Sequence, residues 1–477
     1  MLKGLEISVL NLSEVKNSIE DFRIHSEFFK KEFLENEIKL KSFNSLPLST
    51  YSKISDGDHS KFPDNQKREV RYLQARDINN NFLEFTSDVF ISKSYLEKNK
   101  RSLLKGEDIL ISIMGTVGDI TILPKGFQPA MCNRALAIVK NIKGISPQFL
   151  FIYLTTKFAF IEIERLKNGG VQQRLNLDVL SKIRIPKLDS DFQEQIEIIV
   201  LQAQETRANS KSIYKKAENI LLDELGLKDF NPKKEAVNIK LFSESFAITE
   251  RIDSEFYQKK YDVIEQAFDK FKRTKLNQLI KYPISSGVTP KAGGNSYTDS
   301  KNGIPFVRAV DLKDGEVITS NFKYIKNKVH NSVLKRTQLE KGDVLLSIAG
   351  TVGRSSIFDH DFEANINQAV SIIRFDEILI KRLYLVAFFN SKIGKEYVSK
   401  YSRQGVQTNL SLVEVGNLSI PIIDFNKQKK IACMIEESFD LKKQSEHLLE
   451  VAKKAVEIAI EENEENALEY IKSETNE

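Results

Sequence analysis

The chain carries two copies of one sequence pattern, separated by about half its length. The tetrapeptide Gly-Thr-Val-Gly at 115–118 returns at 350–353, a shift of 235 positions in a chain of 477 residues. Further matches keep the same order around this anchor: 23–29 with 251–257, 72–78 with 306–312, 170–172 with 405–407, and 185–186 with 420–421. The period is far longer than the ~20–50 residues of solenoid repeats. It therefore predicts a duplicated domain, and a partner that offers two comparable sites.

Positive charge is concentrated in two segments, although the net formal charge is only +5. Residues 41–187, the first module, hold 23 Lys and Arg against 14 Asp and Glu. Residues 272–424, the second module, hold 22 against 14. The rest of the chain then has 12 more acidic than basic residues. Chance could explain one such segment, but two favour a pair of surfaces that bind a polyanion.

Each module is expected to be a mixed α/β domain with short strands. Short apolar runs bounded by Gly or Pro predict strands at 108–114 and 135–139, and again at 344–348 and 369–373. The two glycines of each Gly-Thr-Val-Gly element predict a tight turn. The element lacks the Lys-Ser/Thr of a phosphate-binding P-loop, so it marks the repeat and is not itself a predicted site. Helices are expected at 147–166 and 380–400.

A long helix with an apolar or small seam follows each module. Residues on the seam recur at alternating steps of three and four, which is typical of a coiled coil. The seam includes Ile196, Ala203, Ser210, Ile213 and Ala217 in the first helix, and Ile431, Ser438, Ser445, Leu448 and Ala452 in the second. Small side chains at matching positions would let two backbones approach closely, so we expect the helices to pair antiparallel. The alternative is that each helix packs only on its own module.

The predicted fold class is α+β, with a pseudo-two-fold internal repeat: two tandem recognition domains separated and joined by the two long helices. The expected boundaries are an N-terminal helical segment at 1–40, the first module at 41–187, a central helix at 188–228, a connector with the second copy of the N-terminal motif at 229–271, the second module at 272–424, and a C-terminal helix at 425–477.

No catalytic or metal-binding motif is apparent in the sequence. The five histidines are scattered singly, without zinc-ligand spacing, and Cys132 and Cys433 lie in different halves and are expected to be buried apolar residues. There is no Walker A sequence and no Gly-x-Ser-x-Gly elbow. No apolar run approaches the ~20 residues of a membrane span, and the N-terminus shows no signal-peptide pattern. We therefore expect a cytoplasmic protein that binds without catalysing, and no bound metal.

Candidate DNA-binding residues combine cations for phosphates with planar amide or guanidinium groups for base edges. In the first module they are Arg68, Arg71, Gln74, Arg76, Arg134, Gln172, Gln173 and Arg174. In the second they are Lys291, Arg308, Arg336, Arg354, Arg403, Gln404, Gln407 and Asn409. A solvated surface role is the alternative for each. The repeated Gly-Val-Gln loop is the strongest single candidate. Specificity should come from positions where the copies differ, such as 58–61 against 288–291.

Taken together, these motifs resemble a known family. Ser-Ile-x-Gly-Thr-Val-Gly is followed in each copy by Gly-Val-Gln, Ile-Pro and a heptad helix that begins near Gln193 or Gln428. The series resembles the specificity (S) subunit of type I restriction-modification systems. Residues 4–29 and 452–457 resemble a sub-branch that is also seen in type IIB systems.

The resemblance implies a non-catalytic reader of double-stranded DNA. Each recognition domain would contact one half of a bipartite target, and the helices would dock two modification (methyltransferase) subunits that methylate adenine. Restriction subunits would add cleavage. S-adenosylmethionine, ATP and magnesium are expected on those partners, with no cofactor on this chain and no membrane association.

Three alternatives remain open from the sequence. The first is a specificity subunit of a type IIB-like system. The second is a stand-alone DNA-modifying enzyme, a nuclease or methyltransferase, which would need a catalytic motif that the sequence does not show. The third is a coiled-coil scaffold protein that does not bind nucleic acid.

Overall fold

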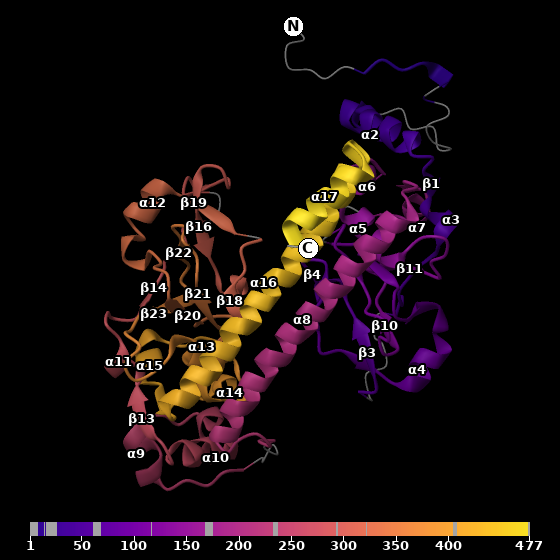
Figure 1. Cartoon of the computed structure of the whole chain (residues 1–477). Helices are drawn as coiled ribbons and strands as arrows, with labels where there is room; N and C mark the ends of the chain where they lie inside the picture. Colours follow the sequence, from indigo (N-terminus) through magenta and orange to yellow (C-terminus); the bar gives the residue numbers. More distant parts are fainter. Residues whose placement is uncertain are drawn as a thin grey trace. The chain divides into compact units, whose positions relative to one another are not determined.

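The computed structural model describes residues 8–13, 15, 26–60, 68–115, 117–166, 175–231, 237–291, 294–320, 322–403 and 408–475. The chain divides into two compact units. Unit 1 comprises Met1–Ala208 and Lys442–Glu477, and unit 2 comprises Asn209–Leu441. Each unit therefore holds one copy of the repeat together with part of both long helices (Figure 1).

Unit 1 contains two four-stranded sheets. The first, in spatial order, is β2 (Lys53–Asp56), β11 (Leu136–Lys140), β8 (Ile109–Ser112) and β9 (Ile120–Ile122), all antiparallel. The second is β6 (Phe90–Ile91), β3 (Val70–Leu73), β10 (Ala130–Cys132) and β7 (Leu103–Leu104), in which only β3 and β10 pair in parallel. The strands predicted at 108–114 and 135–139 are thus confirmed as β8 and β11.

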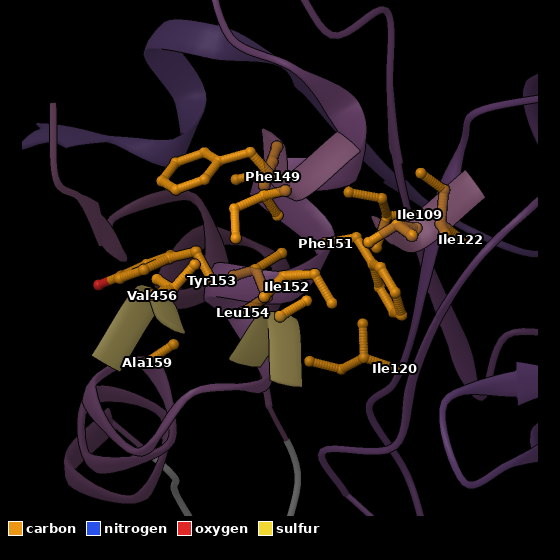
Figure 2. Packing of buried hydrophobic residues seen from close by; sticks show 14 of the residues in the cluster. Ile109, Ile120, Ile122, Phe149, Phe151, Ile152, Tyr153, Leu154, Ala159 and Val456 are labelled. Carbon is orange, nitrogen blue, oxygen red and sulfur yellow. The ribbon is translucent and has the colours of Figure 1, made fainter. Parts of the chain in front are cut away.

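The core of unit 1 is built around α5 (Pro147–Thr155), which is buried from Gln148 to Leu154. Phe151 of this helix lies beside Ile109, Ile120 and Ile122 of the first sheet, as Figure 2 shows. Its Tyr153 lies beside Val456 of the last long helix (Figure 2). A helix that is apolar on all sides belongs in a core, since no face of it can be presented to water.

Other unit 1 elements are short. They are η1 (Ser26–Phe29), α2 (Lys31–Ser42), β1 (Leu46–Pro47), α3 (Leu48–Tyr51), η2 (Ala75–Asp77), β4 (Ile78–Asn79), β5 (Phe82–Leu83), α4 (Lys93–Lys98), η3 (Lys100–Ser102), α6 (Lys157–Leu166), α7 (Leu177–Ser181), β12 (Arg184–Ile185) and α17 (Glu464–Thr475).

Unit 2 repeats the two-sheet plan with more strands. One sheet has the order β14 (Ser285–Ser286), β23 (Val370–Ile373), β20 (Asp343–Ser347), β21 (Ser355–Phe358), β18 (Gly315–Val317) and β17 (Leu312–Lys313). The other has β15 (Tyr297–Thr298), β19 (Lys323–Lys326), β16 (Gly303–Val307) and β22 (Asn365–Ile366). The strands predicted at 344–348 and 369–373 are β20 and β23.

The remaining elements of unit 2 are mostly helical. They are η4 (Phe242–Glu244), α9 (Phe246–Thr249), η5 (Ser254–Tyr257), α10 (Lys259–Phe268), β13 (Lys272–Lys275), α11 (Leu276–Leu279), η6 (Ala309–Asp311), α12 (Asn327–Asn331), η7 (Lys335–Thr337), α13 (Arg382–Asn390), α14 (Lys392–Tyr401), α15 (Leu412–Asn417) and β24 (Ser419–Ile422).

The helical segments predicted at 147–166 and 380–400 are confirmed, but each consists of two helices separated by a break that the sequence did not predict. The segment 147–166 forms α5 and α6, separated by Thr156, whose backbone is extended at φ −70° and ψ 159°. The segment 380–400 forms α13 and α14, separated by Ser391 at φ −63° and ψ 158°. The Ser391 hydroxyl caps α14 by accepting the Gly394 N–H at 3.0 Å, which stabilises the break.

The two long helices are α8 (Ser190–Glu224) and α16 (Phe425–Glu461). In unit 1, Ile196 and Ala203 of α8 share a core with Leu448 and Ala452 of α16. Helix α8 ends near Gly226, which has φ +67°, as expected for a glycine that terminates a helix.

In unit 2, Ser210 of α8 and Ser438 of α16 each donate a hydrogen bond to the other's carbonyl, at 2.7 and 2.9 Å. Such bonds require close approach of two backbones, which small side chains permit.

The cysteines differ from expectation at one position: Cys132 is buried, but Cys433 is exposed on α16, so its predicted burial was wrong. A position near the seam in sequence can still face solvent, because a helix turns about 100° per residue. Among the described residues, no helix is long and apolar enough to cross a membrane.

Candidate nucleic-acid interface

The repeated Gly-Thr-Val-Gly element is a turn between neighbouring strands in both units. Gly115 and Gly118 have φ of +83° and +105°, and Gly350 and Gly353 have +76° and +92°. Residues with a Cβ rarely adopt such angles, which explains why both glycines recur. The predicted turn is therefore confirmed for the residues that the structure describes.

Each of these turns lies beside the segment that comes after the repeated Gly-Val-Gln. In unit 2, the Gly350 N–H donates to the Thr408 carbonyl at 3.3 Å, and the Leu410 N–H donates to the Ile348 carbonyl at 2.8 Å. In unit 1, the Leu175 N–H donates to the Ile113 carbonyl at 3.3 Å. Leu175 in unit 1, and Thr408 and Leu410 in unit 2, are thus neighbours of the strand end that leads into the glycine turn, although each lies more than 50 residues further along the chain.

Five candidate residues lie outside the described residues, and they belong to the loop with the strongest sequence signal. They are Gln172, Gln173, Arg174, Gln404 and Gln407.

The cations of the first module are presented in different ways. Arg76 and Arg134 are exposed, and the structure gives neither side chain an acidic partner among the described residues. Arg68 is exposed, pairs with Asp88 and lies over the ring of Phe90, its guanidinium carbon 4.5 Å from the ring centroid. Arg71 is half-buried between aromatic rings. The four cations are therefore not equally free to reach a ligand.

Gln74 occupies a backbone position that is built identically in both units. Its N–H donates to the buried Asp77 carboxylate at 2.8 Å, and the Arg308 N–H donates to the buried Asp311 at 2.8 Å. Each aspartate thereby caps a 3-10 turn, η2 or η6. The repeat at 72–78 and 306–312 thus encodes a shared structural turn.

The side chain of Arg308 is also hydrogen-bonded within its own module. Its Nε and Nη2 donate to the two Asp311 carboxylate oxygens at 3.0 and 2.8 Å. The hydrogen bonds with Asp311 raise the pKa of Arg308 above its ordinary value. A guanidinium held in this way is less available to a base than an exposed one.

The other candidates of the second module lie at the surface. Lys291, Arg336 and Arg354 are exposed. Arg403 is also exposed, with its Nε 3.5 Å from the Glu414 carboxylate. Asn409 is exposed too, and its backbone bridges to Arg403 and to Ala349 beside the glycine turn. The structure thus brings Arg403, Asn409 and the 350–353 turn together at one end of unit 2.

Part of the divergent segment 58–61 has a structural role. The Asp58 carboxylate accepts hydrogen bonds from the hydroxyls of Tyr72 at 3.3 Å and Tyr95 at 2.9 Å. Burial, together with the nearby Asp58 charge, raises the pKa of Tyr72 well above its ordinary range, so this hydroxyl remains a donor. Asp58 is therefore occupied within the module, whereas His59 and Ser60 are exposed.

Sequence reasoning missed the aromatic residues that hold the first-module arginines. Phe85 is 51% exposed and stacks on Phe127 with 6.5 Å between centroids. Its ring also lies 4.2 Å from the guanidinium carbon of Arg71. A single exposed phenylalanine cannot be distinguished from a core residue in sequence, so no signal identified it.

The predicted seam residues are mostly buried. Ile213 is partly exposed, and the buried ones are Ile196, Ala203, Ser210, Ala217, Ile431, Ser438, Ser445, Leu448 and Ala452. Among the described residues, no cluster of three or more His, Cys, Asp or Glu could hold a metal ion.

Comparison with known proteins identifies the family. The model of the type I restriction modification DNA specificity domain matches residues 52–219 and 269–451, well over half of the chain and once in each repeat. The chain therefore belongs to the family of type I restriction-modification DNA specificity proteins.

The chain is similar to several characterised members of this family. It is 26% identical over 201 residues to the EcoBI specificity subunit of Escherichia coli, a region covering 40% of this chain and 41% of that subunit. The crystal structure of the type I S subunit from M. genitalium is 14% identical and overlaps 90% of this chain and 95% of that one, with a TM-score of 0.36. The HsdS subunit of Thermoanaerobacter tengcongensis is 13% identical, covering 86% and 96%, with a TM-score of 0.27. The family assignment rests on the sequence match and not on these superpositions.

Proposed function

We propose that this chain is the DNA sequence-specificity subunit of a type I restriction-modification complex. It binds a bipartite target, with one half-site for each recognition domain, and has no catalytic activity of its own. Modification subunits supply adenine methylation with S-adenosylmethionine, and restriction subunits supply ATP- and magnesium-dependent cleavage.

One observation carries the proposal: the specificity-domain match occurs once in each repeat. Each repeat also presents exposed cations, Arg76 and Arg134 in one and Arg336 and Arg354 in the other. Two separate basic domains of one family suit two half-sites, because cations position a protein on phosphates while differing side chains read different bases.

The two long helices set the distance between half-sites in this proposal, pairing as an antiparallel coiled coil. Support comes from the reciprocal hydrogen bonds of Ser210 and Ser438, and from the core that Ala203 and Ala452 share. Helix α8 has 35 residues, which corresponds to about 52 Å at 1.5 Å per residue. That length exceeds one turn of DNA, about 34–36 Å.

The segment 237–252 is our proposed contact for a modification subunit. It exposes seven large apolar side chains, which are Val237, Ile239, Leu241, Phe242, Phe246, Ile248 and Ile252. Several exposed large apolar side chains within one short segment are typical of protein-binding sites. Two Lys or Arg against two Glu within the segment make it neutral, which suits a protein better than DNA.

Polar contacts fix the backbone of this segment on unit 2. Asn238 Nδ2 donates to the Tyr257 carbonyl at 2.6 Å, and the Lys240 amine lies 2.8 Å from the Asp262 carboxylate. Arg251 donates to the Tyr401 carbonyl at 3.3 Å. Because the backbone is fixed, the apolar side chains stay exposed to water. This exposure is unfavourable unless a partner covers them.

The decisive experiment is methylome sequencing of a host with and without this gene, together with its modification subunit. We expect a bipartite adenine-methylated motif that disappears when the gene is deleted. A methylome that does not change would contradict the proposal. Methyltransferase, ATPase or nuclease turnover by the purified chain alone would contradict the non-catalytic assignment.

Docking is tested by Ile239→Ser with Phe242→Ser in co-purification with the modification subunit. Loss of the complex, with DNA binding by the chain retained, is the expected result. The matched control is Ile378→Ser, an isoleucine of unit 2 that is 79% exposed outside the segment. Equal complex yield for both variants would exclude this contact.

The distance function is tested by inserting four residues at Ser210. The insertion lengthens α8 by about 6 Å and rotates the distal part of the helix by about 40° beyond one turn. We expect a changed spacer between half-sites or loss of binding. Unchanged binding at the original spacing would show that the helix does not set the distance.

A further inference from the structure

The Arg71 side chain is held between two aromatic rings in unit 1. Its guanidinium carbon lies 4.2 Å from the ring centroid of Phe85 and 4.7 Å from that of Phe90. A planar guanidinium stacked on aromatic faces gains cation–π energy and loses most of its rotational freedom before any ligand arrives. One of its nitrogens also approaches the Ser87 carbonyl at 3.4 Å. Arg71 is therefore the most preorganised guanidinium among the first-module candidates that the structure describes.

The charge of Arg71 is not consumed by an ion pair. Among the described residues, no carboxylate lies within ion-pair distance of Arg71, although Asp88, which pairs with Arg68, also interacts electrostatically with Arg71. Phe85, which covers one face of the guanidinium, is itself 51% exposed and extends the stack to Phe127. A planar cation and an aromatic ring thus stand together at the surface of the module.

The second unit lacks this arrangement at the equivalent position. Arg71 pairs with Phe90 across β3 and β6, and Pro305 pairs with Tyr324 across β16 and β19 at the same shift of 234 positions. The backbone framework repeats while the side chain changes from arginine to proline. A residue that reads a base is expected to differ between two domains with different half-sites.

We propose that Arg71, clamped by Phe85 and Phe90, reads a guanine in the half-site bound by the first module. Arginine donates two parallel hydrogen bonds to O6 and N7 of guanine, which no other base can accept in the major groove. The rings fix the plane of this donor fork. The inference rests on the proposed function and adds the base and the residue that reads it.

A covering role over the core is the competing explanation, because Phe127 packs against the apolar cluster below. Substitution of Arg71 by lysine distinguishes the covering role from base reading. Lysine keeps the charge and the aliphatic cover but has no planar fork. Arg71→Lys should therefore preserve stability and lose base discrimination.

The test uses the complete chain with its modification subunit and the target found by methylome sequencing. Each guanine of the first half-site is replaced in turn by 7-deazaguanine, which removes the N7 acceptor. We expect the wild-type complex to lose about 10- to 100-fold in affinity at one guanine. The Arg71→Lys complex should bind the unmodified target about 10- to 100-fold more weakly than the wild type. Replacing that guanine by 7-deazaguanine should then cause no further loss of affinity.

Two further variants make the test specific. Phe85→Leu keeps Arg71 but removes a stacking face, and should reduce the effect of that 7-deazaguanine several-fold. Arg101→Lys is the matched control, because Arg101 is exposed in the same module, pairs with Asp56 and touches no aromatic ring among the described residues. It should retain the wild-type profile.

Three results would overturn the assignment: a first half-site without guanine, full discrimination retained by both Arg71→Lys and Phe85→Leu, or equal loss for Arg101→Lys. Failure of the proposed function would look different, because the wild-type complex would then read no bipartite target at all.

Discussion

In unit 1 the Arg184 N–H is accepted by the Glu162 carboxylate at 2.8 Å, whereas in unit 2 the Ser419 N–H, 235 positions later, donates to the Tyr397 hydroxyl at 3.3 Å. The same backbone donor needs a partner in both units, since an unpaired buried N–H is costly. A carboxylate satisfies it in one copy and a hydroxyl in the other. The repeat thus retains the donor and leaves the acceptor free to change.

The aspartate caps show the complementary case. Asp77 and Asp311 occupy the same position, but their surroundings differ. Asp77 accepts from the Ser87 N–H at 2.7 Å and from the hydroxyls of Ser87 and Thr86, while Asp311 accepts from the Arg308 guanidinium. An identical residue in the two copies is therefore no guide to identical chemistry around it.

The largest effect is expected from exchanging residues 41–187 for the equivalent module of a related subunit. If the units read separate half-sites, one half of the methylated motif should change completely and the other should stay. Specific binding exceeds non-specific binding by about 10³–10⁷-fold, so the former target should no longer be recognised. Methylome sequencing measures this directly. A change in both half-sites would contradict the prediction that the two units read their half-sites independently.

Removing the capping carboxylates should affect stability to different extents. Asp77→Ala leaves the part-buried N–H of Gln74 and the buried N–H of Ser87 without their acceptor, and hydrogen bonds to charged groups contribute about 1.5–3 kcal/mol each. We expect a loss of about 3 kcal/mol or more in the free energy of unfolding. Asp311→Ala should cost less, because the partly exposed Arg308 can turn to solvent. Denaturant unfolding of the two variants gives the comparison, and equal costs would contradict it.

Because of Glu162, the stability of unit 1 should depend on pH. Tyr397, at the corresponding place in unit 2, should cause no such dependence. Burial raises the pKa of Glu162 to about 7. Its folded pKa exceeds the unfolded value, so its contribution to stability is complete below about pH 4.5 and is lost as the pH rises through 7. Glu162→Gln should therefore be more stable than wild type above pH 7. The gain should be a few kcal/mol at most, because a tenfold change in the proton affinity of a carboxylate corresponds to about 1.4 kcal/mol.

The pH prediction is checked by thermal unfolding between pH 4 and pH 8. Burial also raises the pKa of Asp108, to about 6. The Glu162→Gln variant should therefore keep part of the dependence of stability on pH. Tyr397→Phe is the control in the other unit and should lower stability equally at every pH in this range. A pH-independent difference for Glu162→Gln would show that its carboxyl does not titrate in this way.

The smallest effect is expected in the long helices. Ser210 and Ser445 occupy equivalent seam positions, but the Ser210 hydroxyl donates to Ser438 on the other helix, and that of Ser445 donates to Lys442 on its own helix at 2.7 Å. Ser210→Ala should cost about 1 kcal/mol of stability, and Ser445→Ala close to none. Equal values in denaturant unfolding would indicate that the bond between helices contributes nothing.

Local sequence patterns predicted much of the fold and only part of the candidate site. The strands β8, β11, β20 and β23 were predictable because short β-branched runs between Gly or Pro are local signals. The breaks at Thr156 and Ser391 were not, because each interrupts an apolar run without a Pro or Gly at the break. Whether the Arg308 side chain is exposed or bound to Asp311 depends on the tertiary structure, which sequence periodicity does not predict.

The sequence by itself determined the duplication, the glycine turns, the long helices and the family, since each depends on residue order or on spacing along the chain. Tertiary structure alone decided which cations are free. Arg76 and Arg308 are both candidate arginines in the repeated segments, yet the first is exposed and the second is bound to Asp311. Phe85 and Phe90 reach Arg71 only because β3 and β6 pair. The physical reason is that burial and charge pairing depend on distances in space, which folding creates between residues far apart along the chain.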